Sequence, residues 1–441
     1  MQILVNTNPL CTPIKNINSK PSIAYTGHTA MRSSISLYPR PILINFGKNH
    51  TNEERAERFI IRGGFPGDFK ADMKWALAVD KLVQKNVQLL KNNRIPDIKT
   101  LIDSFSKDYG DIKRTLNEEY TTKWYANLSD TSKKLVDYLS EVQNDPKKIT
   151  KQRFKEIFGE KNYQEQYDHK QDIIDKVKGH KYGHNVELGD IEDFGKPRKK
   201  DSIWQDIRVQ GYHYPATTGA DLYPGSKFDK YAKMNEALLD QNKIKPKIVD
   251  INSPEIANMD IDPEHYLWGL KKGNFSLYSF EKKTPLGDFP ILTTTVLFGE
   301  LDTDLLKNHF PKKIYENPNK KRLTALVWKT AEPEHFEKIN EHLENLYKNY
   351  LKQKSLPNNN EKKAKIMGIV PEIQWYFCQM MPFERGSALI GDAIARSLME
   401  GAGLKLSRWK EGVLPDLETF VTDLNTYKSN YANLFEIPPS F

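Results

Sequence analysis

The clearest hydrophobic pattern lies near the C-terminal end, where two apolar helices are predicted to meet across a short turn. Residues 366–380 are apolar on nearly every face of a helix, which is typical of an element buried on all sides. Pro371 lies inside this run, and the pattern leaves open whether it kinks the helix or starts it. After the turn, apolar residues at every fourth position predict a second helix from Ser387 to Ala402; they are Ile390, Ile394 and Leu398.

Helical periodicity also dominates the chain from Thr51 to about residue 180. Thr51 is a suitable N-cap for the first helix, Pro96 ends the long amphipathic helix that follows, and Ser129 with Asp130 offers another start. The apolar spacing predicts helices over residues 52–61, 73–90, 98–105, 120–128, 135–142 and 154–177.

The period changes in the C-terminal half, where apolar and polar residues alternate as they do in β-strands. Residues 275–280 and 291–298 flank a turn at 284–288, which predicts an antiparallel hairpin. Further strands are expected over 247–251 and 322–330, and further helices over 228–239, 335–351, 363–381 and 417–434.

These elements predict a predominantly helical α+β fold, with a helical N-terminal domain and a C-terminal helical bundle that carries a small antiparallel sheet. The first 50 residues contain five prolines and no acidic residue, so we expect a flexible polar arm there. Glycine, proline and charged residues become dense after about residue 185. The expected regions are an arm over 1–50, a helical domain over 51–185, a linker or long loop over 186–225, and an α+β domain over 226–441.

The composition is that of a folded protein, with 38% hydrophobic and 28% charged residues, a net charge of +8 and a pI near 9.0. Basic and acidic residues are interspersed and form no recognised nucleic-acid-binding module, so nucleic acid is not expected as a partner. Two isolated cysteines, Cys11 and Cys378, favour a reducing, cytoplasmic compartment. We find neither a Sec-type signal nor the roughly 18 continuous apolar residues of a transmembrane helix. The acid-poor arm is compatible with export by a non-Sec route.

The turn before Ser387 has the chemistry of an anion site. The first amides of a helix lack intrahelical partners and carry the positive end of the helix dipole, so they attract phosphate or carboxylate. Arg385 adds a cation, Gly386 allows close backbone approach, and Ser387 is the expected N-cap. We therefore interpret Arg385, Gly386 and Ser387 as a candidate site for the phosphate of ATP or another nucleotide donor. The alternative is that they only turn and cap the chain.

The same turn resembles a known active-site segment. It reads Met381-Pro382-Phe383-Glu384-Arg385-Gly386-Ser387-Ala388-Leu389, which is similar to the His-Pro-Phe-x-x-Gly-Asn-Gly-Arg of the Fic (filamentation induced by cAMP) superfamily. The resemblance covers Met381 to Leu404. Met381 stands where that family has its catalytic histidine, so ordinary Fic chemistry is not expected, because a thioether cannot take a proton from a hydroxyl. Leu389 also replaces the phosphate-binding arginine. The avirulence protein B group of plant pathogens is similar to Fic in fold and also lacks the motif.

The resemblance implies a bacterial effector or toxin-like protein that acts in virulence on a protein of the host. Two functions remain open. The first is a nucleotidyl- or glycosyl-transferase with a nucleotide or nucleotide-sugar donor at the Gly386–Ser387 helix start. The second is a non-enzymatic interaction module in which the degenerate scaffold is structural.

The sequence gives few signs of other catalytic or metal-binding residues. The common catalytic signatures are absent, so no catalytic residue is assigned. His180 and His184 have a spacing that zinc ligands use on a helix, but Gly179 and Gly183 disfavour a helix there, and no metal site is predicted.

Overall fold

The fold is that of a computed structural model, in which part of the chain is described. The predicted arm, the pair His180 and His184, and the predicted boundaries near residues 185 and 225 lie outside the described residues and side chains, so those predictions stay untested. The described residues are 51–60, 69–143, 145–182, 193–199, 206–210, 229–257, 259, 271, 273, 275–300, 302, 304, 307 and 321–441.

The described residues form two compact units. The first contains residues 110–182 with 193 and 194, and the second contains residues 51–109 together with those from 195 onward. Helix α3 (Ile98–Ala126) begins in the second unit and ends in the first. It is one helix where the spacing predicted two, because the buried residues Phe105, Tyr109 and Leu116 continue a single helical stripe through the expected gap.

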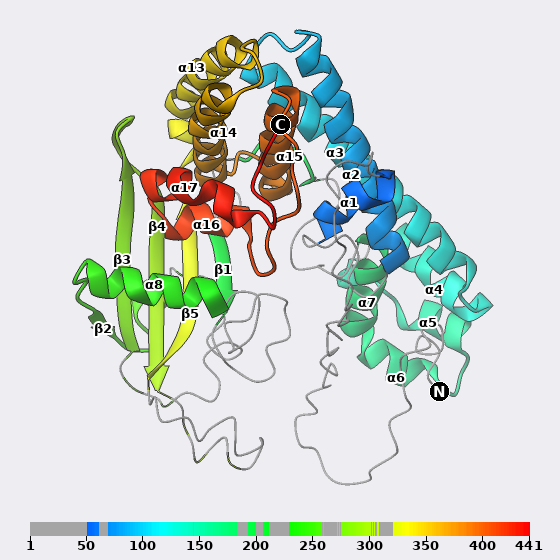
Figure 1. Cartoon of the computed structure of the whole chain (residues 1–441). Coiled ribbons are helices and arrows are strands. Elements are labelled where there is room, and N and C mark those ends of the chain that lie inside the picture. Colours follow the sequence, from blue (N-terminus) through cyan, green and yellow to red (C-terminus); the bar gives the residue numbers. More distant parts are fainter. Residues whose placement is uncertain are drawn as a thin grey trace. The chain divides into compact units, whose positions relative to one another are not determined.

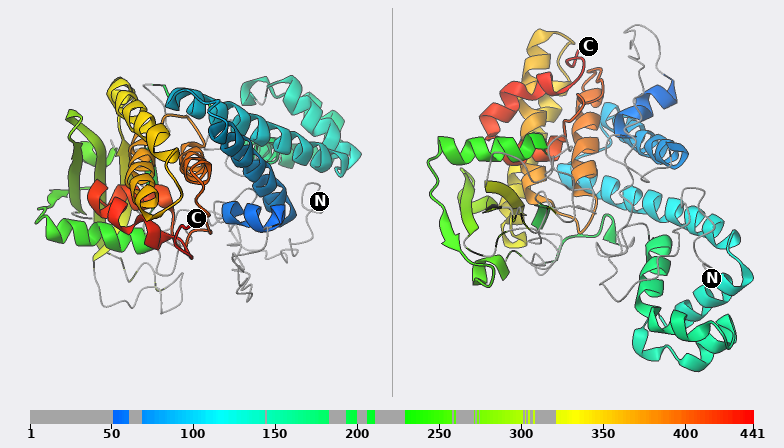
Figure 2. Two further views of the ribbon diagram at one scale, coloured as in Figure 1. Left: turned by 45° about the horizontal axis from the view of Figure 1, so that its top comes forward. Right: turned by 90° about the horizontal axis from the view of Figure 1, so that it is seen from below.

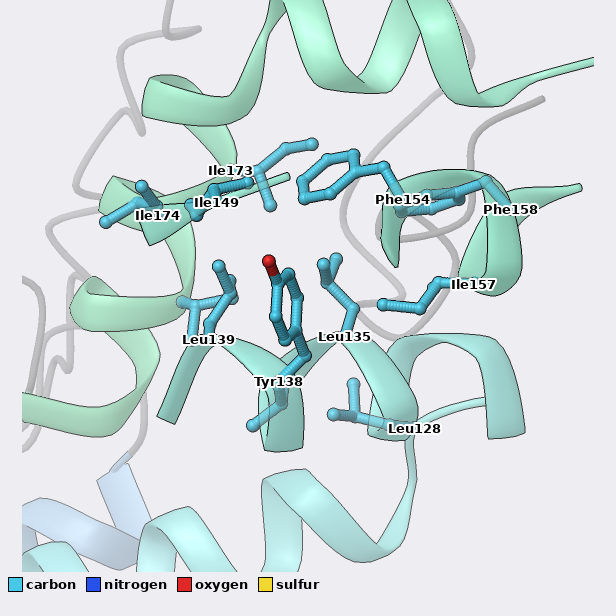
Figure 3. Packing of buried hydrophobic residues seen from close by; sticks show 12 residues of the cluster. Leu128, Leu135, Tyr138, Leu139, Ile149, Phe154, Ile157, Phe158, Ile173 and Ile174 are labelled. Atoms are coloured by element: carbon cyan, nitrogen blue, oxygen red, sulfur yellow. The ribbon is translucent and has the colours of Figure 1, made fainter. Parts of the chain in front are cut away.

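The first unit is helical throughout its described part. Ser129 caps α4 as predicted, because its hydroxyl accepts the amide of Ser132 at 3.2 Å. Figure 3 shows Tyr138 of α4 among apolar side chains from α5 and α7. The helix predicted over 154–177 is wrong, because Gly159, with φ of 77°, ends α5 and two more helices follow. The elements are α4 (Asp130–Glu141), η1 (Pro146–Lys148), α5 (Lys151–Phe158), α6 (Tyr163–Asp168) and α7 (Lys170–Tyr182).

The second unit contains a five-stranded sheet in the order β1-β5-β4-β3-β2, and all neighbouring strands are antiparallel. The predicted hairpin is confirmed, since Tyr278 pairs with Val296 across β3 and β4. The predicted linker contains an unexpected strand, β1, which pairs with β5 at one edge. The strands are β1 (Asp206–Gln210), β2 (Lys247–Val249), β3 (Phe275–Thr284), β4 (Gly287–Glu300) and β5 (Lys321–Thr330).

Helices lie along the sheet, and α8 (Asp229–Gln241) crosses one of its faces (Figure 1). A short helix, α9 (Pro254–Ala257), follows β2. The C-terminal helices begin after β5 with η5 (Pro333–His335) and α13 (Phe336–Lys354). They continue as α14 (Asn360–Met380), α15 (Ser387–Gly401), α16 (Pro415–Val421), α17 (Leu424–Asn430) and η6 (Tyr431–Leu434).

Helix α14 is the centre of this unit, as its apolar pattern predicted. It contacts α13, α15, α16, α17 and β4, an arrangement that Figures 1 and 2 show from three directions. Pro371 lies inside the helix, so it neither starts nor ends it. The helix predicted over 417–434 is instead α16, α17 and η6. The break falls at Asp423, whose carboxylate caps α17 by accepting the amide of Thr426 at 2.9 Å.

The N-terminal helices of this unit pack against the same bundle. Thr51 caps α1 (Asn52–Ile60) as predicted, with a capping box in which Thr51 and Glu54 exchange hydrogen bonds between side chain and backbone amide. Helix α2 (Phe69–Lys91) contacts α1 and α15. The helices confirm a predominantly helical α+β fold.

Candidate functional site

The turn between α14 and α15 runs from Met381 to Gly386 and is only partly buried. Glu384, Arg385 and Gly386 are each partly exposed, so solvent reaches the start of α15. The N-cap of α15 is Gly386, with φ of 93° and ψ of −3°, a conformation that glycine adopts without strain. Within the described part of the chain, this N-cap residue makes no side-chain hydrogen bond to the helix. Its first amides therefore keep the capacity to bind an anion.

The predicted N-cap role of Ser387 is wrong. Ser387 is the first residue of α15 and is 4% exposed. Its hydroxyl accepts the amide of Phe383 at 2.9 Å and donates to the carbonyl of Phe383 at 3.2 Å. Gly386 turns the chain into the helix, so the serine hydroxyl is not used as a cap. It bonds to the backbone of Phe383 instead and so stabilises the turn.

A segment from the predicted linker, which we name the strap (residues 195–199), pairs with this turn. Pro197 bridges to Phe383 in antiparallel fashion. The amide of Glu384 donates to the carbonyl of Lys196 at 2.9 Å, and the amide of Gly195 donates to the carbonyl of Arg385 at 3.1 Å. The candidate site is thus made from two segments almost 190 residues apart in sequence.

Two residues hold the strap in place. Arg198 is 6% exposed; it donates to the hydroxyl of Thr330 at 2.5 Å and to the carbonyl of Ala331, and its guanidinium lies 4.9 Å from the ring centroid of Phe336. Gly195 has φ of 77°, and a Cβ added there would lie 2.1 Å from the carbonyl oxygen of Ser106. Only glycine fits at that position.

The strap brings cations to the turn. Lys196 and Lys199 are exposed and lie on either side of the bridge at Pro197, next to the partly exposed Arg385. The carboxylate of Glu384 accepts the amide of Lys199 at 2.9 Å, which directs that carboxylate to the strap backbone. Lys196, Lys199 and Arg385 thus belong to two segments that pair just before the start of α15. The sequence predicted a linker or long loop over residues 186–225, and nothing in the basic run after Gly195 indicates this contact.

Met381 occupies the position of the histidine in the resembling segment. It is the C-cap of α14, with φ of 42° and ψ of 65°, and is 5% exposed. A non-glycine residue in this left-handed conformation costs on the order of 1 kcal/mol, and such backbone strain concentrates at functional turns. The thioether supplies no proton transfer.

A histidine, a glutamate and a lysine that no sequence motif indicates join three helices. His342 Nε2 of α13 lies 3.0 Å from Glu372 Oε1 of α14, and Lys428 of α17 pairs with the other carboxylate oxygen. Burial acts to raise the pKa of Glu372, but the hydrogen bonds from His342 and Lys428 outweigh it and hold the pKa below its usual value. The two residues of the pair are 30 positions apart on different helices, so no short motif could reveal them.

Lys282 of β3 is the second polar group that only the fold reveals. Its ammonium donates to the carbonyls of Thr419, Phe420 and Thr422 at 2.8, 2.9 and 2.9 Å, and so satisfies the C-terminal end of α16. Burial lowers the pKa of Lys282 to about 7.

No helix among the described residues is both long enough and apolar enough to cross a membrane.

Comparison with known proteins gives two findings. Residues 302–438 match the avirulence protein family AvrB_AvrC, and this range contains β5, helices α13 to α17 and the turn with Arg385, Gly386 and Ser387. A stretch of 98 residues, 22% of this chain, is 22% identical to avirulence protein B of Pseudomonas savastanoi pv. glycinea and covers 29% of that protein. The chain thus matches less than a third of that relative's length. The expected resemblance to the avirulence protein B group is supported, whereas similarity to Fic proteins stays a prediction.

Proposed function

We propose that this protein is a bacterial effector that enters host cells by a non-Sec route and acts there on a host protein. The similarity of residues 302–438 to avirulence proteins supports this assignment. We further propose that it is a transferase whose donor, a nucleotide or nucleotide sugar, binds through its phosphates at the start of α15.

The observation that carries the donor proposal is the meeting of the strap with the turn. The strap, which carries Lys196 and Lys199, pairs with the turn that carries Arg385 just before the start of α15, and these three cationic residues support a phosphate site there. A diphosphate carries enough charge and enough acceptor oxygens for both the amides and the cations, and charge-assisted hydrogen bonds are the strong ones. The strap would orient the donor, and the amides would hold its phosphate.

The chemistry available at the turn limits the reaction. Met381 cannot act as the base that activates a target hydroxyl, so proton removal must come from another group or from the target itself. The catalytic residue is not assigned. Both nucleotidyl and glycosyl transfer are consistent with a site that binds and orients phosphates.

The test is isothermal titration of the full chain with ATP, GTP and UDP-glucose. At least one donor should bind, and Arg385→Ala should weaken that binding by about tenfold or more, as the loss of one charge-assisted contact implies. Arg94→Ala is the matched control, because Arg94 is an exposed arginine of the same unit outside the site. Absence of binding by all three donors, or equal binding by Arg385→Ala and wild type, rejects the proposal.

A second candidate function is a non-enzymatic interaction module. It is favoured by one observation: the strap and the Ser387 hydroxyl both bond to the turn, as they would if the turn were purely structural. This reading predicts a stoichiometric host partner whose binding survives Arg385→Ala. A pull-down that recovers no such partner, together with donor binding, decides against it.

A further inference from the structure

Strand β3 has an edge that the sheet leaves open. The short β2 pairs only with residues 275–277 at the start of β3, and β3 extends beyond it (Figure 1). On that outer side, residues 278–284 form no backbone hydrogen bond to any other described residue. An unpaired strand edge presents amides and carbonyls that another strand can bind. This edge is therefore a candidate interaction surface.

The side chains along the open edge alternate between the two faces of the sheet. Ser279, Glu281 and Lys283 are exposed. Phe280 and Lys282, which lie between them, are partly buried. Because successive side chains of a strand point to opposite faces, the exposed glutamate and lysine lie on the same face. The edge thus carries two opposite charges, two positions apart.

Strand β3 is regular along this edge, although its pairing with β4 is not. The pairing shifts after Lys282, where the partner residue changes from Leu292 to Pro290. Ile291 is therefore an extra residue of β4, and the next shift likewise adds residues only to β4. A bulge in the edge strand itself would bend it away from a partner, and β3 has none here.

Lys283 has a partner within its own hairpin, but a weak one. Its ammonium lies 3.0 Å from Asp288 Oδ1, and the two side chains are 62% and 92% exposed. Ion pairs between side chains as exposed as these contribute little stability. The lysine can therefore also pair with a carboxylate that approaches along the open edge.

We propose that two copies of this chain associate through the open edges of β3, antiparallel about a two-fold axis at Lys282. In this register Glu281 of each copy lies opposite Lys283 of the other, and opposite charges directly across two strands are stabilising. A two-fold axis repeats the contact, so each dimer has two such pairs. The backbone hydrogen bonds continue the sheet from one copy into the next.

Charge selects this register over its neighbours. An axis at Glu281 would place the two copies of that glutamate opposite each other, and an axis at Lys283 would do the same with two lysines; like charges directly opposite are destabilising. Lys282 does lie opposite its own copy in the proposed register. Its ammonium, however, is already bound by three carbonyls at the C-terminal end of α16, at 2.8 to 2.9 Å.

The position of β2 excludes an axis nearer the start of β3. An axis at Phe280 would bring Lys283 of the second copy opposite Leu277, where β2 already pairs. In the proposed register, Leu286 at the turn of the second copy's hairpin comes opposite Tyr278. The hairpin of the second copy therefore ends where β2 begins, and both fit along the same side of β3.

The experiment measures the dimer Kd of the full chain by sedimentation equilibrium over a series of concentrations. The wild type should dimerise. Glu281→Lys places lysine opposite lysine at both pairs, and Lys283→Glu places glutamate opposite glutamate, so each should raise the dimer Kd by about tenfold or more. The double variant Glu281→Lys with Lys283→Glu makes the facing charges opposite again, so it should regain the wild-type Kd.

Glu361→Lys is the matched control. Glu361 is an exposed glutamate of α14 that pairs with Lys365, so this variant makes the same charge change away from β3 and should dimerise as the wild type does. Circular dichroism confirms that each variant is folded. A wild type that stays monomeric overturns the proposal and favours a strand of a different protein as the occupant of the edge. A Kd unchanged in Glu281→Lys, or a folded double variant that stays monomeric, overturns it as well.

Discussion

Arg396 Nε lies 3.1 Å from Asp392 Oδ1 one turn earlier in α15, and both side chains are at most 1% exposed. Their spacing of four residues places both side chains on one face of the helix. In the fold the same carboxylate oxygen also accepts the indole N–H of Trp409 at 3.0 Å, and the guanidinium donates to the carbonyl of Ser407 at 3.1 Å. The pair therefore fastens α15 to the segment that follows it.

Replacing one residue of this pair should lower the free energy of unfolding by more, per residue replaced, than replacing both. Asp392→Asn leaves the buried Arg396 charge without its carboxylate, and Arg396→Met leaves the carboxylate without its cation, so each should lower the free energy of unfolding by about 3–5 kcal/mol. The double variant Asp392→Asn with Arg396→Met should lose less than the sum of the two, since no charge remains buried. Urea unfolding of the four proteins measures this, and single variants that lose less than about 1 kcal/mol contradict it.

Substitutions of Arg385 and Ser387 should affect different properties, donor binding in the first case and stability in the second. Arg385→Ala should weaken donor binding by about tenfold or more with little change in melting temperature, because a partly exposed arginine contributes little to folding. Ser387→Ala should lower stability by about 1–3 kcal/mol, since it leaves the buried amide of Phe383 without an acceptor. Thermal melts and donor titrations on both variants check this. A destabilised Arg385→Ala protein with normal donor binding refutes the phosphate site.

The strap should depend on the absence of a side chain at Gly195. Gly195→Ala places a Cβ 2.1 Å from the Ser106 carbonyl oxygen, so the strap must move and donor binding should weaken. Gly412→Ala is the control, because Gly412 has nearly the same φ, 76° against 77°, but nothing within 4 Å of its added Cβ. Both variants bear left-handed strain of about 1 kcal/mol, and only Gly195→Ala adds a clash. Equal donor affinity in the two variants means that the strap does not shape the site.

Lys282 should make stability depend on pH. Its pKa of about 7 in the folded protein lies below the roughly 10.4 of an unfolded lysine, so between these values the unfolded state holds more protons. The free energy of unfolding should therefore rise as pH increases from about 7 to about 10, and this contribution is lost as pH falls through 7. Urea unfolding across this range should show that the stability of wild type relative to Lys282→Met increases with pH. A constant difference contradicts the lowered pKa.

The sequence by itself determined the elements whose cause is local. The apolar spacing of residues 366–380 predicted a helix buried on every face, and α14 is that helix. Alternation predicted the hairpin of β3 and β4, and the caps at Thr51 and Ser129 form as expected because a cap needs only residues within one turn. The turn at Arg385 was also visible, since proline and glycine interrupt two helical patterns there.

The tertiary structure alone decided what lies against these elements. Nothing in the sequence near residues 195–199 indicates that they pair with the turn before α15, or that Gly386 rather than Ser387 caps that helix. The pairing of His342 with Glu372 and the burial of Asp392 with Arg396 also arise from packing between helices. The spacing of apolar residues shows which side of a helix or strand is apolar. It does not show which distant segment covers that side. The partners of a polar residue are therefore fixed only when the chain has folded.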